Sequence, residues 1–115
     1  MVLWIGFDLQ PEKEAGDVNN WTALHFAAVY GKEAVAAQLL QAGASVSAVT
    51  ANGSTPLHWA ASYGESSIAN LLLQANASPT AVNKYGDTPA QGAKRRGHGD
   101  LAARLLEAEQ AAALK

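Results

Sequence analysis

Apolar residues recur along the chain with the spacing of one face of an α-helix. Each group has its members at i, i+4 and i+5, and the groups are Val35, Leu39 and Leu40, then Ile68, Leu72 and Leu73, then Leu101, Leu105 and Leu106. Each group follows the one before it by 33 residues, which is a spacing typical of repeat proteins. The pattern therefore predicts one helix with a buried face in every copy of a repeat.

A second, shorter helix is predicted ahead of each apolar group. Its start is marked by a residue that caps helices well, namely Thr22, Thr55 and Thr88. Pro56 and Pro89 come next, in the first helical position, where a missing N–H does no harm. The helix should end about nine residues later at a glycine that favours the left-handed conformation, namely Gly31, Gly64 and Gly97.

The repeat extends beyond these helix signals. Residues 22–49 align with 55–82 without a gap and are identical at more than half of the positions. Within them Thr22-Ala-Leu-His-Phe-Ala-Ala recurs as Thr55-Pro-Leu-His-Trp-Ala-Ala, and a weaker third copy begins at Thr88. One helix pair cannot bury its own apolar stripe, but stacked pairs can, so the sequence predicts an all-α fold of stacked pairs.

The repeated motif resembles that of the ankyrin-repeat family, whose unit of about 33 residues carries Thr-Pro-Leu-His-x-Ala-Ala. The resemblance covers roughly residues 17–110 and implies a solenoid of helix-turn-helix pairs joined by β-turn or hairpin loops. The chain departs from the family pattern at Asn20, at Ala23 and at Ala90-Gln91. The last departure suits a C-terminal cap, because a cap leaves one side in water and needs less apolar bulk.

The repeat boundaries divide a single predicted domain, residues 1–115, into four segments: an N-terminal cap or extension (1–16) and three repeats (17–49, 50–82 and 83–115), the last including a C-terminal cap. Four apolar residues near the start, Leu3, Trp4, Ile5 and Phe7, are expected to cover the open end of the first repeat, in a helix or an extended segment. Alternatively, they mark where a preceding repeat of a longer protein was lost.

Composition narrows the classes of partner. Eight Lys and Arg against ten Asp and Glu give a net charge of −2, so neither nucleic acid nor a membrane is expected as a partner. The opening apolar run meets Asp8 and lacks a basic flank, which predicts neither a signal peptide nor a membrane span. The absence of cysteine excludes disulfides and favours an intracellular protein, cytoplasmic in preference to nuclear.

Histidine is the first candidate for chemistry. His25 and His58 occupy the same position in consecutive repeats and cannot converge on one metal. The resemblance implies instead that each holds its turn by hydrogen bonding to backbone, and His98 is expected to be exposed. No nucleophile-base arrangement, phosphate-binding loop or carboxylate pair emerges, so we expect no catalytic residue, no metal, no cofactor and no enzyme activity.

Residues that differ between repeats are free to contact a partner, and the resemblance implies two strips that do so. On the turn tips they are Val18, Asn19, Trp21, Asn52, Lys84, Tyr85 and Asp87; on the concave side of the first helices they are Tyr30, Trp59, Ser62, Tyr63, Arg95 and Arg96. Trp, Tyr and Arg are the residue types most enriched in binding hot spots. The sequence therefore predicts a protein-protein interaction module, expected to be a monomer rather than a homo-oligomer.

Alternative roles stay open for several of these residues. Phe26 and Trp59 either contact a partner or pack between helices, whereas Trp21 and Tyr85 are expected to be exposed on turn tips. The basic run 94–96 suits the C-terminus of its own helix, or it binds phosphate or an acidic peptide. The alternative function is that of an architectural or self-assembling fragment of a larger ankyrin-repeat protein.

Overall fold

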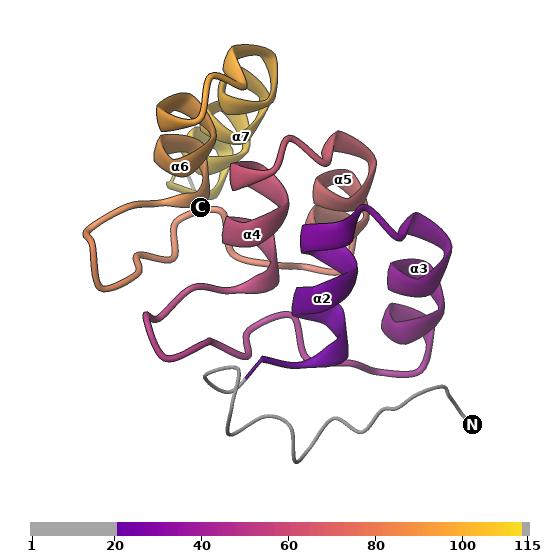
Figure 1. The fold of residues 1–115 in the computed structure, drawn as a ribbon. Coiled ribbons are helices and arrows are strands. Elements are labelled where there is room, and N and C mark those ends of the chain that lie inside the picture. The colour runs from indigo at the N-terminus through magenta and orange to yellow at the C-terminus, as the bar shows by residue number, and fades with distance from the viewer. Residues whose placement is uncertain (1–20, 114–115) are drawn as a thin grey trace.

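Residues 21–113 are described by the computed structural model and form six α-helices in three antiparallel pairs (Figure 1). The pairs are α2 (Ala23–Tyr30) with α3 (Glu33–Gln41), α4 (Pro56–Ser62) with α5 (Ser66–Gln74), and α6 (Pro89–Arg95) with α7 (Gly99–Ala113). No strand occurs within these residues. The predicted all-α solenoid of helix pairs is confirmed.

The helices form two layers. The first helices of the pairs stack as α2, α4 and α6, while α3 packs against α5 and α7 packs against α6. The long loops that join one pair to the next project from the side of α2 and α4, away from α3 and α5 (Figure 1). Each loop and the first helix that follows it therefore contribute to the same side of the molecule.

Small residues fill the contacts between the stacked first helices. Ala28, Ala60, Ala61 and Ala93 are fully buried there, and Ala27 nearly so. The distance between packed helices depends on the side chains at the contact, so alanine lets these short helices approach closely. The largest fully buried side chains are Leu24, Leu57, Ile68, Leu72, Leu105, His25, Pro56 and Pro89.

Two residues of the predicted buried faces, Val35 and Leu106, are each 46% exposed, so their assignment to a buried face is wrong. Ile68 and Leu101, which are equivalent to Val35, are 1% and 4% exposed. They pack inside the stack because a helix pair precedes each of them, and Val35 belongs to the first described pair. Its neighbours Leu39 and Leu40 are half-buried against the core.

The predicted threonine caps are confirmed, and each belongs to a reciprocal capping box. The hydroxyl of Thr55 accepts a hydrogen bond from the His58 N–H, and the Thr55 N–H donates to His58 Nδ1 over 3.0 Å. Thr22 and His25 repeat this arrangement. Two backbone donors at each helix start are thereby paired, one of them by an imidazole that the helix itself supplies.

The other nitrogen of each imidazole links its repeat to the next. Because Nδ1 accepts from a backbone N–H, the proton of the neutral ring lies on Nε2. The Nε2 of His58 donates to the carbonyl of Asp87 over 2.9 Å. The Nε2 of His25 lies 3.1 Å from the carbonyl of Ala48 and 3.2 Å from that of Ser54. The structural role implied for these histidines is confirmed.

Gln91 occupies the histidine position in the third pair and explains one departure from the family pattern. It preserves the capping box, since the Thr88 N–H donates to its Oε1 over 2.9 Å. Gln91 is exposed, and no further pair follows it among the described residues. An amide that completes the box without bridging to another repeat is sufficient at this position.

The third histidine, His98, is half-buried, so the expectation that it is simply exposed is wrong. Its ring lies directly over Gly64, where an added Cβ would come within 2.7 Å of the imidazole. Glu65, one repeat earlier, covers Gly31 in the same way. Gly64 has φ +70°, a left-handed conformation that favours glycine, so this position needs glycine for both its backbone and its neighbour.

Burial sets the protonation state of the two bridging histidines. It lowers the pKa of His25 from 6.5 to about 4, against the opposing effect of the carbonyls of Ser54 and Ala48. Burial also lowers the pKa of His58, opposed by the carbonyls of Asp87 and Ala81 and by the Asp87 carboxylate. Both rings are therefore neutral in the folded protein at pH 7, as their hydrogen bonds require.

We expect acid to destabilise the fold through these two rings. Between pH 6.5 and about 4 the unfolded chain binds protons that folded His25 excludes, so its contribution to stability is present above pH 6.5 and is lost as the pH falls. The loss is on the order of 3 kcal/mol for His25 alone. Urea unfolding followed by circular dichroism between pH 4 and 7.5 measures it.

The matched variant for this measurement is His25→Gln/His58→Gln, because the chain already uses glutamine in the third capping box. It should be less stable at pH 7.5, by about 1 kcal/mol for each lost bridge. Its stability should depend less on pH between 5 and 6.5. An equally steep slope in this variant would contradict the assignment of the acid response to the two histidines.

Candidate functional site

Two hairpin loops between the helix pairs form one side of the site. In the first, the Thr50 N–H donates to the Ser54 carbonyl and the Gly53 N–H to the Thr50 carbonyl. The second repeats this pattern between Asn83 and Asp87. The Lys84 N–H donates to the Asn52 carbonyl over 2.9 Å, so the two loops hold each other in place. The predicted hairpin connections are confirmed.

An asparagine side chain organises the inside of each loop. Asn52 Oδ1 accepts from the Thr50 hydroxyl over 2.6 Å and from the Ser54 N–H over 3.1 Å. Asn83 Oδ1 accepts from the N–H groups of Tyr85 and Asp87, over 2.9 and 3.1 Å. Its Nδ2 also donates to the Ser54 hydroxyl. These bonds fix the backbone from which the Tyr85 side chain projects.

A continuous row of aromatic rings runs across the first two repeats, and we call it the aromatic strip: Tyr30, Phe26, Trp21, Trp59 and Tyr63. The ring centroids of Trp21 and Trp59 are 4.6 Å apart, and those of Trp21 and Phe26 are 5.0 Å apart. Tyr30 extends the row from Phe26, and Tyr63 extends it from Trp59, each over 6.3 Å. These distances lie within the range in which aromatic pairs attract.

The buried and exposed rings of the strip have different roles. Trp21 is half-buried between Phe26 and Trp59, so the expectation of an exposed turn-tip residue is wrong for it. The equivalent residues of Trp21, Ser54 and Asp87, are buried in their repeats. Tyr30 and Tyr63 are 66% and 43% exposed. The strip thus consists of a packed centre with two tyrosines available to solvent.

Two arginines continue the strip into the third repeat. The guanidinium carbon of Arg96 lies 5.7 Å from the ring centroid of Tyr63, within the range of a cation-π contact. Arg95 forms an ion pair with Asp87 through Nη2 and Oδ1, 3.0 Å apart. The Arg95 side chain is 67% exposed, whereas Asp87 is nearly buried, so the arginine remains accessible while it neutralises the aspartate.

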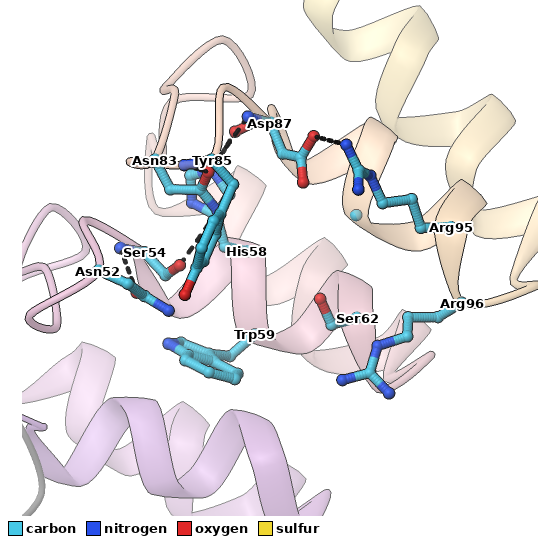
Figure 2. Close-up of a pocket in the computed structure, with 11 residues that line it drawn as sticks. Asn52, Ser54, His58, Trp59, Ser62, Asn83, Tyr85, Asp87, Arg95 and Arg96 are labelled. Carbon is cyan, nitrogen blue, oxygen red and sulfur yellow. Dashed lines mark hydrogen bonds and ion pairs between the residues drawn. The ribbon is translucent and has the colours of Figure 1, made fainter.

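Two adjoining hollows open on this face. The larger one, of about 420 Å³, is lined by Trp21, Thr50, Ala51, Asn52, Trp59, Lys84 and Tyr85. The smaller one, of about 280 Å³, lies over Gly92 between Trp59, Tyr85 and the two arginines (Figure 2). Trp59, Asn52 and Tyr85 border both hollows. Tyr85 is 68% exposed and stands over the smaller hollow in Figure 2.

The structure brings most of the predicted binding residues onto one face. Trp21, Asn52, Trp59, Ser62, Lys84, Tyr85, Asp87, Arg95 and Arg96 all line the two hollows. Tyr30 and Tyr63 lie at the ends of the aromatic strip. Phe26 and Trp59 are half-buried, in keeping with packing between helices, but Trp59 also forms a wall of both hollows. Val18, Asn19 and the apolar residues 3–7 lie outside the described residues.

Two residues that shape the site carried no signal that the sequence predictions used. Asn83 holds the second loop through three hydrogen bonds of its side chain. The equivalent residue in the first loop is Thr50, so comparison of the repeats does not reveal this role. Gly92 forms the floor of the smaller hollow. Its equivalents are Phe26 and Trp59, so the loss of an aromatic ring at this position was the available sign of an opening.

The chemistry of the face is that of binding by contact. Hydroxyl, amide, guanidinium and aromatic groups line the hollows, and the buried His58 ring is already engaged at both nitrogens. Within residues 21–113, no group of three His, Cys, Asp or Glu is arranged to hold a metal ion. Over the same residues, no helix has the length and apolar character needed to cross a membrane.

A family model described as ankyrin repeats in three copies matches residues 3–83. The match covers more than half of the chain, and the chain belongs to the ankyrin-repeat family. Ankyrin repeats are generally protein-protein interaction modules, and the family is typically non-catalytic. The match begins upstream of the first described helix pair and ends at Asn83, ahead of Thr88, where the third copy of the motif begins. No curated protein matches the sequence.

We expect Asn83→Ala to loosen the loop that presents Tyr85. The variant removes the acceptor of the Tyr85 and Asp87 N–H groups, so both amides should exchange with solvent faster than in the wild type. Asn83→Asp keeps an acceptor oxygen and should retain most of the protection. Hydrogen exchange measured by NMR checks both variants, and unchanged rates in Asn83→Ala would show that the loop is held by other contacts.

Proposed function

We propose that this protein binds a partner protein across the face formed by the aromatic strip, the second loop and the two arginines. The observation that carries the proposal is the continuity of that face, in which large side chains of three repeats meet around two hollows. Three exposed tyrosines provide contact area to a partner. They are Tyr30 and Tyr63 at the ends of the aromatic strip and Tyr85 on the second loop. Tyr, Trp and Arg dominate binding hot spots because they combine large area with a polar group.

The contrast between the residues that hold the stack together and those of the face supports the same proposal. The capping threonines recur in every repeat and the bridging histidines in the first two, where they maintain the stack. Most residues of the face differ between repeats, as at Phe26, Trp59 and Gly92, which are equivalent positions. Differences that the stack does not require are available for recognition of one particular surface.

Binding would proceed by rigid presentation. The hairpin loops are linked to each other and, through the histidines, to the helix starts, so the face is ordered before a partner arrives. Association then loses little conformational entropy in this chain, and a few side chains can determine specificity. We assign no catalytic step to the chain, because the groups on the face offer contacts and no pairing of a nucleophile with a base.

The variant Tyr30→Ala/Tyr63→Ala/Tyr85→Ala tests the proposal. All three rings are well exposed, so the variant should fold with the helix content of the wild type. It should lose most of the partner that wild-type protein retains from cell extract, as judged by quantitative mass spectrometry. Circular dichroism of both proteins establishes that the loss does not arise from unfolding.

Val35→Ala/Leu106→Ala is the matched control, because both side chains are exposed apolar groups on the second helices of their pairs. It should retain the same partner as the wild type. Equal retention by the tyrosine variant would contradict binding through this face. Self-association of the purified protein in sedimentation experiments, without retention of another protein, would favour the alternative of an assembling fragment.

A further inference from the structure

The row of large side chains breaks at Gly92, and the smaller hollow occupies the vacated space. Phe26 and Trp59 stand at this position in the first two repeats, and each packs within the aromatic strip. In the third repeat an added Cβ would meet only the Ser62 hydroxyl, at 3.3 Å. A side chain at this position would therefore require only a small shift of the Ser62 hydroxyl, and the missing side chain leaves an opening of about 280 Å³.

The walls of this hollow are aromatic on one side and cationic on the other. Trp59 and Tyr85 border it towards the first two repeats, and Arg95 and Arg96 border it towards the last (Figure 2). The Ser62 hydroxyl lies in its floor beside Gly92. A group with an apolar stem and an anionic end would contact both kinds of wall.

The net positive charge of the hollow matches the charge of one carboxylate group on a ligand. Arg95 uses Nη2 for Asp87, and its other N–H donors have no partner among residues 21–113. Within the same residues the Arg96 guanidinium makes no hydrogen bond. Two arginines against one aspartate leave a single surplus positive charge, although the whole chain carries −2. A phosphate group, with a charge of about −1.5 to −2, would exceed that surplus and face the Asp87 carboxylate.

The size and position of the hollow suit a side chain of a partner protein. Pockets for small-molecule ligands usually enclose roughly 300–1,000 Å³, and this one, of about 280 Å³, is at the small end of that range. The larger hollow, between Trp21 and Trp59, adjoins it across Asn52 and Tyr85. A segment of protein lying over both would place one side chain in each.

We propose that the hollow over Gly92 is an anchor site for a glutamate or aspartate of the partner, with a neighbouring apolar side chain in the hollow between Trp21 and Trp59. The acidic residue receives hydrogen bonds from Arg95 and Arg96, and its methylene groups lie against Trp59. This inference rests on the proposed function and specifies the chemistry of the partner.

Selection from a library of random peptides displayed on phage tests the inference, with the wild-type protein as bait. The selected sequences should pair an acidic residue with an apolar or aromatic one. A synthetic peptide of the selected sequence should bind about tenfold more weakly when its acidic residue is replaced by the corresponding amide, as measured by fluorescence polarisation.

Two variants of the protein probe the hollow itself. Gly92→Trp fills it with the residue that α4 carries at the equivalent position, and Arg96→Glu reverses one of its charges. Each should weaken the peptide about tenfold or more. Arg104→Glu makes the same change of charge on the exposed surface of α7 and should leave the affinity within about twofold. Far-ultraviolet circular dichroism verifies that all three variants fold.

The outcomes separate this inference from the function on which it rests. Peptides without an acidic residue that bind Gly92→Trp as well as wild type, but lose affinity for Trp59→Ala, would overturn the anchor site and leave the binding face intact. Equal weakening by Arg96→Glu and Arg104→Glu would also overturn it, since general attraction would then suffice. Selection of no binding peptide would count against both proposals.

Discussion

The hydrogen bond from a buried imidazole of one repeat to a backbone carbonyl of the next is the interaction on which this structure depends. The helices of the first two pairs have seven to nine residues, and such helices are marginal in isolation. Many of their buried residues are alanine, which contributes little apolar area. His25 and His58 offset this small apolar area with hydrogen bonds from both ring nitrogens. Nδ1 accepts from the backbone at a helix start, and Nε2 donates to a carbonyl of the following loop. The loops are thereby fixed relative to the helices, and burial keeps both rings neutral.

This arrangement separates the residues that hold the frame from those that form the face. Thr55 and His58 fix the start of α4 and the next loop, so Trp59 and Ser62 are not needed to hold these elements in place. The equivalent positions then change along the stack, from Phe26 and Val29 in the first repeat to Gly92 and Arg95 in the third. Such a gradient gives the face an apolar end and a cationic end, and a partner that binds across both must lie in one direction. The same change that opens the hollow over Gly92 thus provides polarity as well as space.

The fold could be predicted from the sequence because its determinants are local and repeated: a capping threonine, a terminating glycine and a helical apolar pattern. Contacts between repeats were harder to predict from the sequence. Val35 fits the helical pattern, yet burial there depends on a preceding pair, and His98 follows a glycine but packs on Gly64 of another repeat. Comparison of equivalent positions selected most of the residues that line the two hollows, although Trp21 packs more deeply than its place beside a turn suggested. Asn83 was missed because the other loop carries Thr50 at the equivalent position and because one of its hydrogen bonds reaches Ser54, a residue of the preceding loop.

The central claim is that a preordered face, and not a rearrangement of the stack, recognises the partner. Titration of labelled protein with a selected peptide, followed by two-dimensional NMR, tests it most directly. Trp59 Nε1 is buried and has no hydrogen-bond partner among the described residues, so its indole signal is a sensitive reporter within the face. We predict shifts confined to the indoles of Trp21 and Trp59 and to the amides of the second loop and the end of α6, with α3 and α5 unchanged. Shifts spread across α3 and α5, or signals that sharpen only after binding, would contradict the claim and indicate folding or repacking on association.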